Sequence, residues 1–216
     1  MEVEIWSDIA CPWCYIGKRR FEAALSQFDH ADDVNVTWRS FELDPTAPAE
    51  DPTPNLERLA AKYGMSVEQA EAAERRVTDT AAGDGLEYHL DQTRIGSTFD
   101  GHRIVQLAKR HGLQDAMKER LFRARFTDGK LVSDPETLVS LATQVGLPEA
   151  EVRETLASDQ FAEDVRADEQ TAREFGISGV PMFVVDRQFG ASGAQPPEQL
   201  LALLQHGWEN SGSDQP

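Results

Sequence analysis

The sequence has little positive charge. Its 216 residues carry 21 Lys and Arg against 38 Asp and Glu, and the formal net charge is −17. A protein that binds nucleic acid needs a basic face, and no basic run is visible, so we expect no nucleic-acid partner. Lysine is scarcer than arginine among the few cations. An acidic, lysine-poor surface is expected of a protein that works in concentrated salt, where screening weakens charge repulsion. The composition therefore predicts a halophilic protein.

Long apolar runs are also lacking. No stretch approaches the roughly 20 apolar residues that span a bilayer, so we expect no membrane partner. The first residues, Met1–Glu4, have no basic segment of the kind that opens a signal peptide. A cytoplasmic location is therefore expected, where thiols are kept reduced. The chain is long enough to bury a sizeable core, either as one ordinary domain or as one domain carrying an insertion.

Cysteine is the scarcest informative residue, with two in the chain. Both lie in Cys11-Pro12-Trp13-Cys14, after an extended apolar run and before a segment with helical spacing. This places Cys11 at the start of a helix, with Pro12 in its first turn. Free N–H groups and the helix dipole stabilise a thiolate there, so Cys11 should be a reactive thiol. Cys14 lies within disulfide reach, so one sulfur can attack and the other can close the ring.

Three other roles for the two cysteines compete with redox chemistry. A zinc site would need two more ligands, but no other cysteine exists and the five histidines show no tight pair spacing. A purely structural disulfide across so short a loop would restrict the unfolded chain little. Two unrelated buried thiols are the third alternative. We favour redox chemistry, with no metal and no cofactor beyond the redox-active Cys11–Cys14 disulfide.

Strands are expected near both ends of the chain. Residues 34–43 are rich in β-branched and aromatic side chains, so strand, helix and strand over the first 43 residues predict a βαβ unit with parallel strands. Residues 180–186 and 189–191 read as two short strands, and a last helix begins near Gln195, which makes a ββα unit. Residues 211–216 read as a polar tail.

The section between these units is largely helical. It contains several helix start and stop signals, among them a capping-box pattern in Ser66 and Gln69. If the two strand-containing units share one sheet, residues 1–54 and 176–216 form an α/β domain, and residues 55–175 form an inserted all-helical domain. The shared sheet would bring Val180 and Pro181 near Cys11, since both segments lie at strand ends. Spacing alone makes Pro181 an ordinary edge-strand proline.

Five segments together resemble a known family. The chain resembles the DsbA-like thioredoxin-fold oxidoreductases, specifically the FrnE-type branch. This branch shares its architecture with 2-hydroxychromene-2-carboxylate isomerases and kappa-class glutathione transferases. A CxxC motif alone is only moderately specific, but the five segments in this order are very specific. They are Trp6–Asp8 leading to Cys11–Lys18, then Thr98–Arg103, Leu121–Phe126, Gly179–Val185 and Ser192–Pro196.

The resemblance implies a thioredoxin fold, βαβ followed by ββα, with an inserted helical domain. It implies that Cys11 is the nucleophile and Cys14 the resolving thiol. It also implies a cis peptide bond between Val180 and Pro181 that faces the disulfide, where an extended substrate can pair with the backbone. The expected partners are disulfide-containing proteins or low-molecular-weight thiols.

Two departures from the family pattern stand near His102. Ser97 replaces the Asn that the family commonly has, and Gly101 replaces Ala, so the resemblance does not carry over a polar contact from that Asn. His102 is a candidate to face the active site from the insert, and a hydrogen-bonded structural histidine is an equal alternative. Trp13 gives the thiol an apolar flank and no positive charge, so the disulfide should be a milder oxidant than one with a basic residue there.

Two rival functions stand beside thiol-disulfide exchange. The first is a glutathione-dependent isomerase or transferase of the related branch. Those enzymes typically carry Ser at the first motif position, whereas this chain has Cys11. The second is a non-catalytic holdase that binds unfolded chains, and holdase action should survive loss of both sulfurs. The retention of both thiols favours electron exchange.

Overall fold

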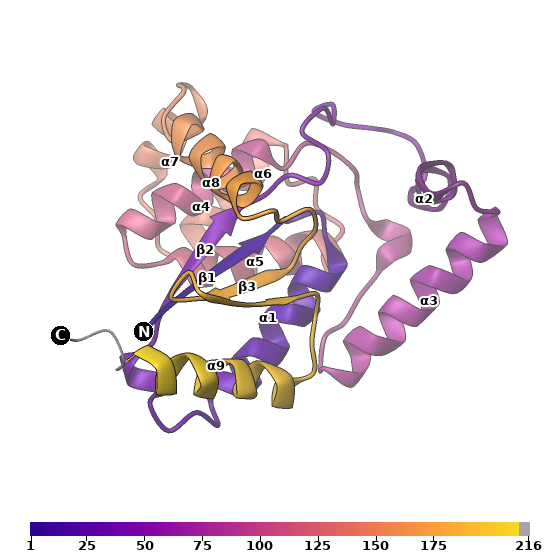
Figure 1. The fold of residues 1–216 in the computed structure, drawn as a ribbon. Helices are drawn as coiled ribbons and strands as arrows, with labels where there is room; N and C mark the ends of the chain where they lie inside the picture. The colour runs from indigo at the N-terminus through magenta and orange to yellow at the C-terminus, as the bar shows by residue number, and fades with distance from the viewer. Residues whose placement is uncertain (212–216) are drawn as a thin grey trace. The chain divides into compact units, whose positions relative to one another are not determined.

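The computed structural model describes residues 1–211, and these divide into two compact units (Figure 1). The first, called the sheet unit here, comprises Met1–Leu43 and the chain from Arg166 onward. The second, called the helical unit, comprises Asp44–Val165. The polar tail expected over residues 211–216 lies, beyond Ser211, outside the described residues.

Both boundaries between the units lie earlier in the chain than the sequence pattern placed them, after residues 54 and 175. At the first boundary, the backbone N–H of Asp51 donates to the Ile95 carbonyl at 2.8 Å, which ties residues 44–54 to the helical unit. At the second, helix α8 (Ala162–Glu174) crosses from one unit into the other. Its later residues belong with the sheet, because the Trp6 Nε1–H donates to the Asp168 carbonyl at 2.9 Å.

The sheet unit is built on four strands in the order β2-β1-β3-β4. Strands β1 and β2 are parallel, with Ser7 opposite Ser40, and helix α1 connects them. Strand β3 is antiparallel to β1, with Trp6 opposite Met182, and β4 is antiparallel to β3. This is the expected βαβ and ββα arrangement. The elements are β1 (Glu2–Ser7), α1 (Pro12–Leu25), β2 (Asn35–Ser40), β3 (Met182–Val185), β4 (Phe189–Ser192) and α9 (Pro197–Ser211).

The two faces of the sheet are covered by different helices. Successive side chains of a strand point to opposite faces, and β1 follows this alternation. Val3 and Ile5 pack with α1 and α9 in the main apolar core, which also contains the stacked rings of Phe21 and Phe183, with ring centroids 5.6 Å apart. Trp6 points to the other face and packs with Ala172 of α8. The sheet is therefore buried on both sides, and its C-terminal strand ends are positioned by two packed layers.

The helical unit has its own buried core. Its α-helices are α2 (Asn55–Tyr63), α3 (Val67–Gly83), α4 (Phe99–Arg110), α5 (Gln114–Phe126), α6 (Pro135–Gln144) and α7 (Glu149–Leu156). The capping box expected from Ser66 and Gln69 is confirmed at the start of α3. The buried guanidinium of Arg103 on α4 donates to the carbonyls of Thr155, Ser158 and Gln160, and so holds the segment between α7 and α8. Across residues 1–211, no helix combines the length and apolarity needed to cross a bilayer.

Candidate active site

The two cysteines lie at the start of α1, as the sequence pattern predicted. Cys11 is the N-cap residue, with extended backbone angles of φ −93° and ψ 113°, and Pro12 occupies the first helical position. The Cys14 N–H donates to the Cys11 carbonyl at 3.0 Å and closes the first turn. Both residues are thiols here, and Cys11 is 5% exposed whereas Cys14 is fully buried. Trp13 between them is 40% exposed. The sulfur nearer the surface is therefore that of Cys11.

The segment before β3 lies against the thiol. The Val180–Pro181 peptide bond, which the resemblance implied to be cis, is cis in the structure. The Cys11 Sγ–H points to the Val180 carbonyl oxygen at 3.5 Å. Pro181 also packs on α1 at Gly17, where an added Cβ would come within 2.9 Å of the proline Cγ. Glycine at position 17 is thus what allows the proline to lie so close to the helix.

Asp8 organises the loop that leads from β1 into Cys11. Its side chain is buried, and each carboxylate oxygen accepts a backbone hydrogen bond. Oδ1 accepts from the Ala10 N–H at 3.0 Å, and Oδ2 accepts from the Leu43 N–H at 2.7 Å. The Asp8 carbonyl also accepts from the Cys11 N–H at 3.1 Å. One residue therefore fixes the thiol loop to the chain that follows β2.

An acidic pair stands beside that attachment point. The Glu42 side chain is 1% exposed, and its Oε2 accepts from Arg166 Nη1 at 2.6 Å. The same guanidinium nitrogen donates to Glu169 Oε2 at 2.7 Å. Two carboxylates therefore share one cationic nitrogen. Burial raises the pKa of Glu42 to about 7, an effect that the Arg166 charge opposes and the Glu169 charge reinforces.

Six of the seven residues expected at the site lie in the sheet unit, where Cys11 at the start of α1 meets the Val180–Pro181 segment. They are Cys11, Pro12, Trp13, Cys14, Val180 and Pro181. The seventh, His102, is fully buried on α4 of the helical unit, and its proximity to the thiols stays a prediction.

Three residues of the thiol neighbourhood had no role in the sequence predictions: Asp8 and Gly17, which lie in the segments that carry the family resemblance, and Glu42. Gly17 carried a usable signal, because a glycine inside a helix costs about 1 kcal/mol and often marks a close approach. Asp8 carried a weaker one, as a lone carboxylate just after an apolar strand. Nothing in the local sequence marks Glu42, since its burial follows from the packing of α8.

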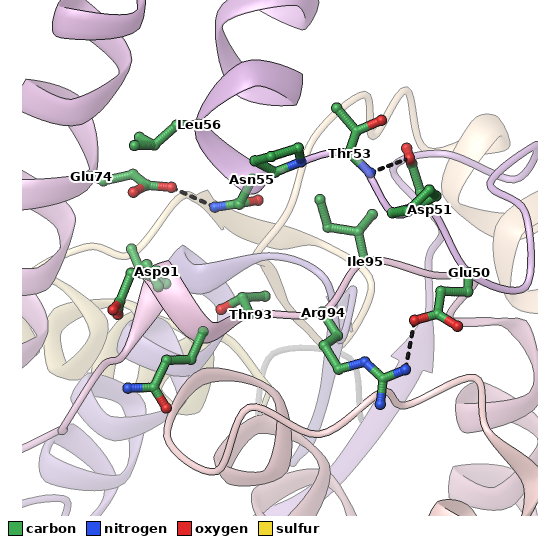
Figure 2. A pocket seen from close by; sticks show the side chains of 14 residues that line it. Glu50, Asp51, Thr53, Asn55, Leu56, Glu74, Asp91, Thr93, Arg94 and Ile95 are labelled. Atoms are coloured by element: carbon green, nitrogen blue, oxygen red, sulfur yellow. Dashed lines mark hydrogen bonds and ion pairs between the residues drawn. The ribbon is translucent and has the colours of Figure 1, made fainter.

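The helical unit contains a separate feature, a cavity of about 380 Å³ (Figure 2). Its lining includes four acidic side chains, Glu50, Asp51, Glu74 and Asp91, and one basic side chain, Arg94. Glu50 accepts from Arg94 at 2.5 Å, and Glu74 accepts from Asn55. Burial raises the pKa of Glu74. The cavity has no cysteine in its lining, so these residues alone cannot perform thiol chemistry. Within residues 1–211, no cluster of three His, Cys, Asp or Glu is arranged to hold a metal ion.

Comparison with known proteins extends over almost the whole chain. The profile of the DSBA-like thioredoxin domain matches residues 2–205. A probable DsbA oxidoreductase from Streptomyces coelicolor is 50% identical, with a TM-score of 0.94 and coverage of 100% of this chain and 92% of that one.

Two more distant structures share the fold. The cytosolic disulfide reductase DsbM from Pseudomonas aeruginosa, solved with GSH, has a TM-score of 0.68 at 16% identity, over 97% of this chain and 100% of that one. A 2-hydroxychromene-2-carboxylate isomerase has a TM-score of 0.71 at 13% identity, over all of both chains. The expected thioredoxin fold of the DsbA type is thereby confirmed.

Proposed function

Because the chain belongs to the DSBA-like thioredoxin domain family, a family of oxidoreductases, we propose that it exchanges disulfides through Cys11 and Cys14. The observation that carries this proposal is the placement of the two sulfurs. Cys11 stands at a helix N-terminus with its Sγ against the Val180 carbonyl, and Cys14 lies buried in the turn that follows. The Cys11 thiol is placed to react with a substrate, and the Cys14 thiol is placed to attack the Cys11 sulfur afterwards.

The exchange takes two steps with balanced electrons. The Cys11 thiolate attacks one sulfur of a substrate disulfide, the substrate S–S bond breaks, and the other substrate sulfur leaves as a thiolate that takes up a proton. Cys14 then loses its proton and attacks the Cys11 sulfur. A Cys11–Cys14 disulfide forms and the second substrate thiol is released. Two low-molecular-weight thiols can return the pair to the reduced state, themselves becoming a disulfide, and the reverse sequence oxidises a dithiol substrate.

The geometry assigns supporting roles to the surrounding residues. The positive N-terminal end of the α1 dipole lies at Cys11 and stabilises negative charge on its sulfur. Asp8 fixes the loop through backbone hydrogen bonds, so that Cys11 keeps its N-cap conformation. Trp13 offers an exposed apolar surface next to the reacting sulfur, which suits an unfolded or extended polypeptide.

We propose disulfide-containing proteins or low-molecular-weight thiols as substrates, and the cytoplasm as the place of action. Support for both comes from the fold shared with DsbM, a cytosolic disulfide reductase whose structure was solved with GSH. In a reducing compartment the pair would act mainly as a reductase. The acidic composition supports the further proposal that it works in concentrated salt.

The test is turnover of insulin disulfides with reduced glutathione as the electron source. The native protein should release insulin thiols, and a Cys11→Ser, Cys14→Ser double variant that keeps its circular dichroism spectrum should not. Suppression of aggregation by the double variant, with no turnover by the native protein, would instead support a holdase. Glutathione-dependent isomerase activity that survives Cys11→Ser would support the related isomerase class, whose fold this chain shares.

A further inference from the structure

Glu42 is a buried acid that the exchange mechanism does not use. It lies two residues after the end of β2, and its side chain is almost inaccessible to solvent. The charged groups that face it come from α8: Arg166, whose Nη1 it binds at 2.6 Å, and Glu169, which binds the same nitrogen at 2.7 Å. A single guanidinium cannot neutralise two carboxylates, so one negative charge is left over at a site that burial makes unfavourable for charge.

Among the carboxylates of this cluster, Glu42 is the one whose protonation state changes near neutral pH. Asp168, which precedes Glu169 on α8, has a partner at each carboxylate oxygen. Oδ1 accepts from Arg39 Nη1 at 2.9 Å, and Oδ2 accepts from the Ser40 N–H at 2.8 Å. Glu169 is somewhat more exposed than Glu42, 11% against 1% for the side chains. A proton added near neutral pH therefore goes to Glu42, in agreement with its pKa of about 7.

A short path of bonds joins Glu42 to the thiol loop. The residue after it, Leu43, donates its N–H to Asp8 Oδ2 at 2.7 Å. Asp8 in turn accepts from the Ala10 N–H through Oδ1 and from the Cys11 N–H through its carbonyl. A change in how Glu42 holds Arg166 therefore acts on the backbone that anchors Asp8, and Asp8 holds the N-cap conformation of Cys11.

We propose that Glu42 is a positioning residue for Cys11, and that the charge on its carboxyl group sets the reactivity of the Cys11 thiol through the Leu43–Asp8 hydrogen bond. The biological meaning of this inference rests on the proposed function. In acid the carboxyl group of Glu42 is neutral, so the charge of Arg166 is paired with Glu169 alone. In alkali the ionised carboxylate shares Arg166, and the negative charge that this adds to the segment bonded to Asp8 through the Leu43 N–H disfavours the thiolate. Glu42 thus lowers Cys11 reactivity at high pH relative to a chain that has no charge there.

The experiment measures the alkylation rate of Cys11 by iodoacetamide between pH 5.5 and 9, in full-length protein carrying Cys14→Ser. At each pH, the alkylation rate of the protein that also carries Glu42→Gln is divided by the rate of the protein that keeps Glu42. We expect a ratio close to its acid value below pH 6 and a rise of at least about twofold through pH 7 to 8. Glu209→Gln, an equal charge change at an exposed position late in α9, should give a flat ratio.

A second variant identifies the titrating group. Glu169→Gln removes the charge that helps to raise the Glu42 pKa, so the inflection in the alkylation profile should move to lower pH. A flat Glu42→Gln ratio across the range, or an inflection that Glu169→Gln leaves in place, overturns the proposal. Alkylation needs only a thiol, so these outcomes are independent of insulin turnover, on which the proposed function stands or falls.

Discussion

The Cys11 sulfur lies 3.5 Å from the carbonyl oxygen of Val180, a residue 169 positions later in the chain. The sheet order produces this meeting. Because β3 runs antiparallel beside β1, the segment before β3 reaches the same end of the sheet as the loop after β1. The Cys11 thiol, at the N-terminus of α1, therefore lies against the backbone carbonyl of Val180. The predictions below test this arrangement.

Gly17→Ala should lower both stability and disulfide exchange. The new methyl group would come within 2.9 Å of Pro181 Cγ and 3.4 Å of Phe183 Cζ, so the Pro181 segment must move away from α1. Overpacking of this kind costs about 1–3 kcal/mol. Chemical denaturation and insulin turnover measure the two effects.

The matched control for Gly17→Ala is Gly83→Ala, at the last position of α3. An added Cβ there meets nothing within 4 Å, so the substitution should leave turnover unchanged. If Gly17→Ala were as stable and as active as Gly83→Ala, the close packing of Pro181 on α1 would be wrong.

Asp8→Ala should loosen the thiol loop. The substitution leaves the Ala10 and Leu43 N–H groups without their acceptor, at a cost of about 1–3 kcal/mol for each group that stays buried. We expect a lower melting temperature and a slower exchange rate. Asp51→Ala is the control, because Asp51 makes the same local bond, to the N–H two residues later, in the helical unit. Equal losses of exchange rate in both variants would argue against a specific role for Asp8.

Glu42 should make stability depend on pH. Its pKa is about 7 in the folded chain, against 4.5 for an unburied glutamate, so the folded chain keeps a proton that the unfolded chain has lost. Stability should therefore fall as pH rises between these values, by on the order of 3 kcal/mol. Glu42→Gln cannot ionise and escapes this loss.

The measurement for this second role of Glu42 is thermal melting from pH 4 to pH 8. The melting temperature of Glu42→Gln should rise relative to the native protein by about 5–10 °C over this range. Glu209→Gln should show no such trend. A constant difference between Glu42→Gln and the native protein would mean that folding does not raise the pKa of Glu42.

Molar potassium chloride should raise the melting temperature. A chain with a net charge of −17 repels itself at low ionic strength, and at 1 M salt the screening length falls to about 3 Å. Melting curves at low and at molar salt give the comparison. An unchanged or lower melting temperature at high salt would remove the support for a halophilic protein and leave the thiol chemistry untouched.

The sequence predicted those features that depend on local pattern. Strand, helix and turn signals placed Cys11 at the start of α1 and separated a sheet-forming part from a helical part. The contacts that long-range register decides could not be predicted. The bond between Asp8 and Leu43 exists because β1 and β2 pair with Ser7 opposite Ser40. The burial of Glu42 likewise depends on where Arg166 of α8 falls against the end of β2.

The domain boundaries differ for the same reason. The sequence pattern assigned residues 44–54 to the α/β domain, but the bond between Asp51 and Ile95 joins this stretch to the helical unit. Helix α8 is continuous in sequence pattern, and only its packing assigns its later residues to the sheet. Local signals locate an element, whereas the unit it belongs to is decided by which apolar face it covers.

The most direct test of the account is the trapping of mixed disulfides, observed by non-reducing mass spectrometry of the two single variants after incubation with oxidised glutathione and with insulin. Cys14→Ser should accumulate a covalent adduct on Cys11, because the attack occurs and the resolving thiol is missing. Cys11→Ser should form little adduct, because the remaining thiol of Cys14 is fully buried. Rapid adduct formation on Cys14 in the Cys11→Ser variant, with none on Cys11 in Cys14→Ser, would contradict the division of labour proposed here.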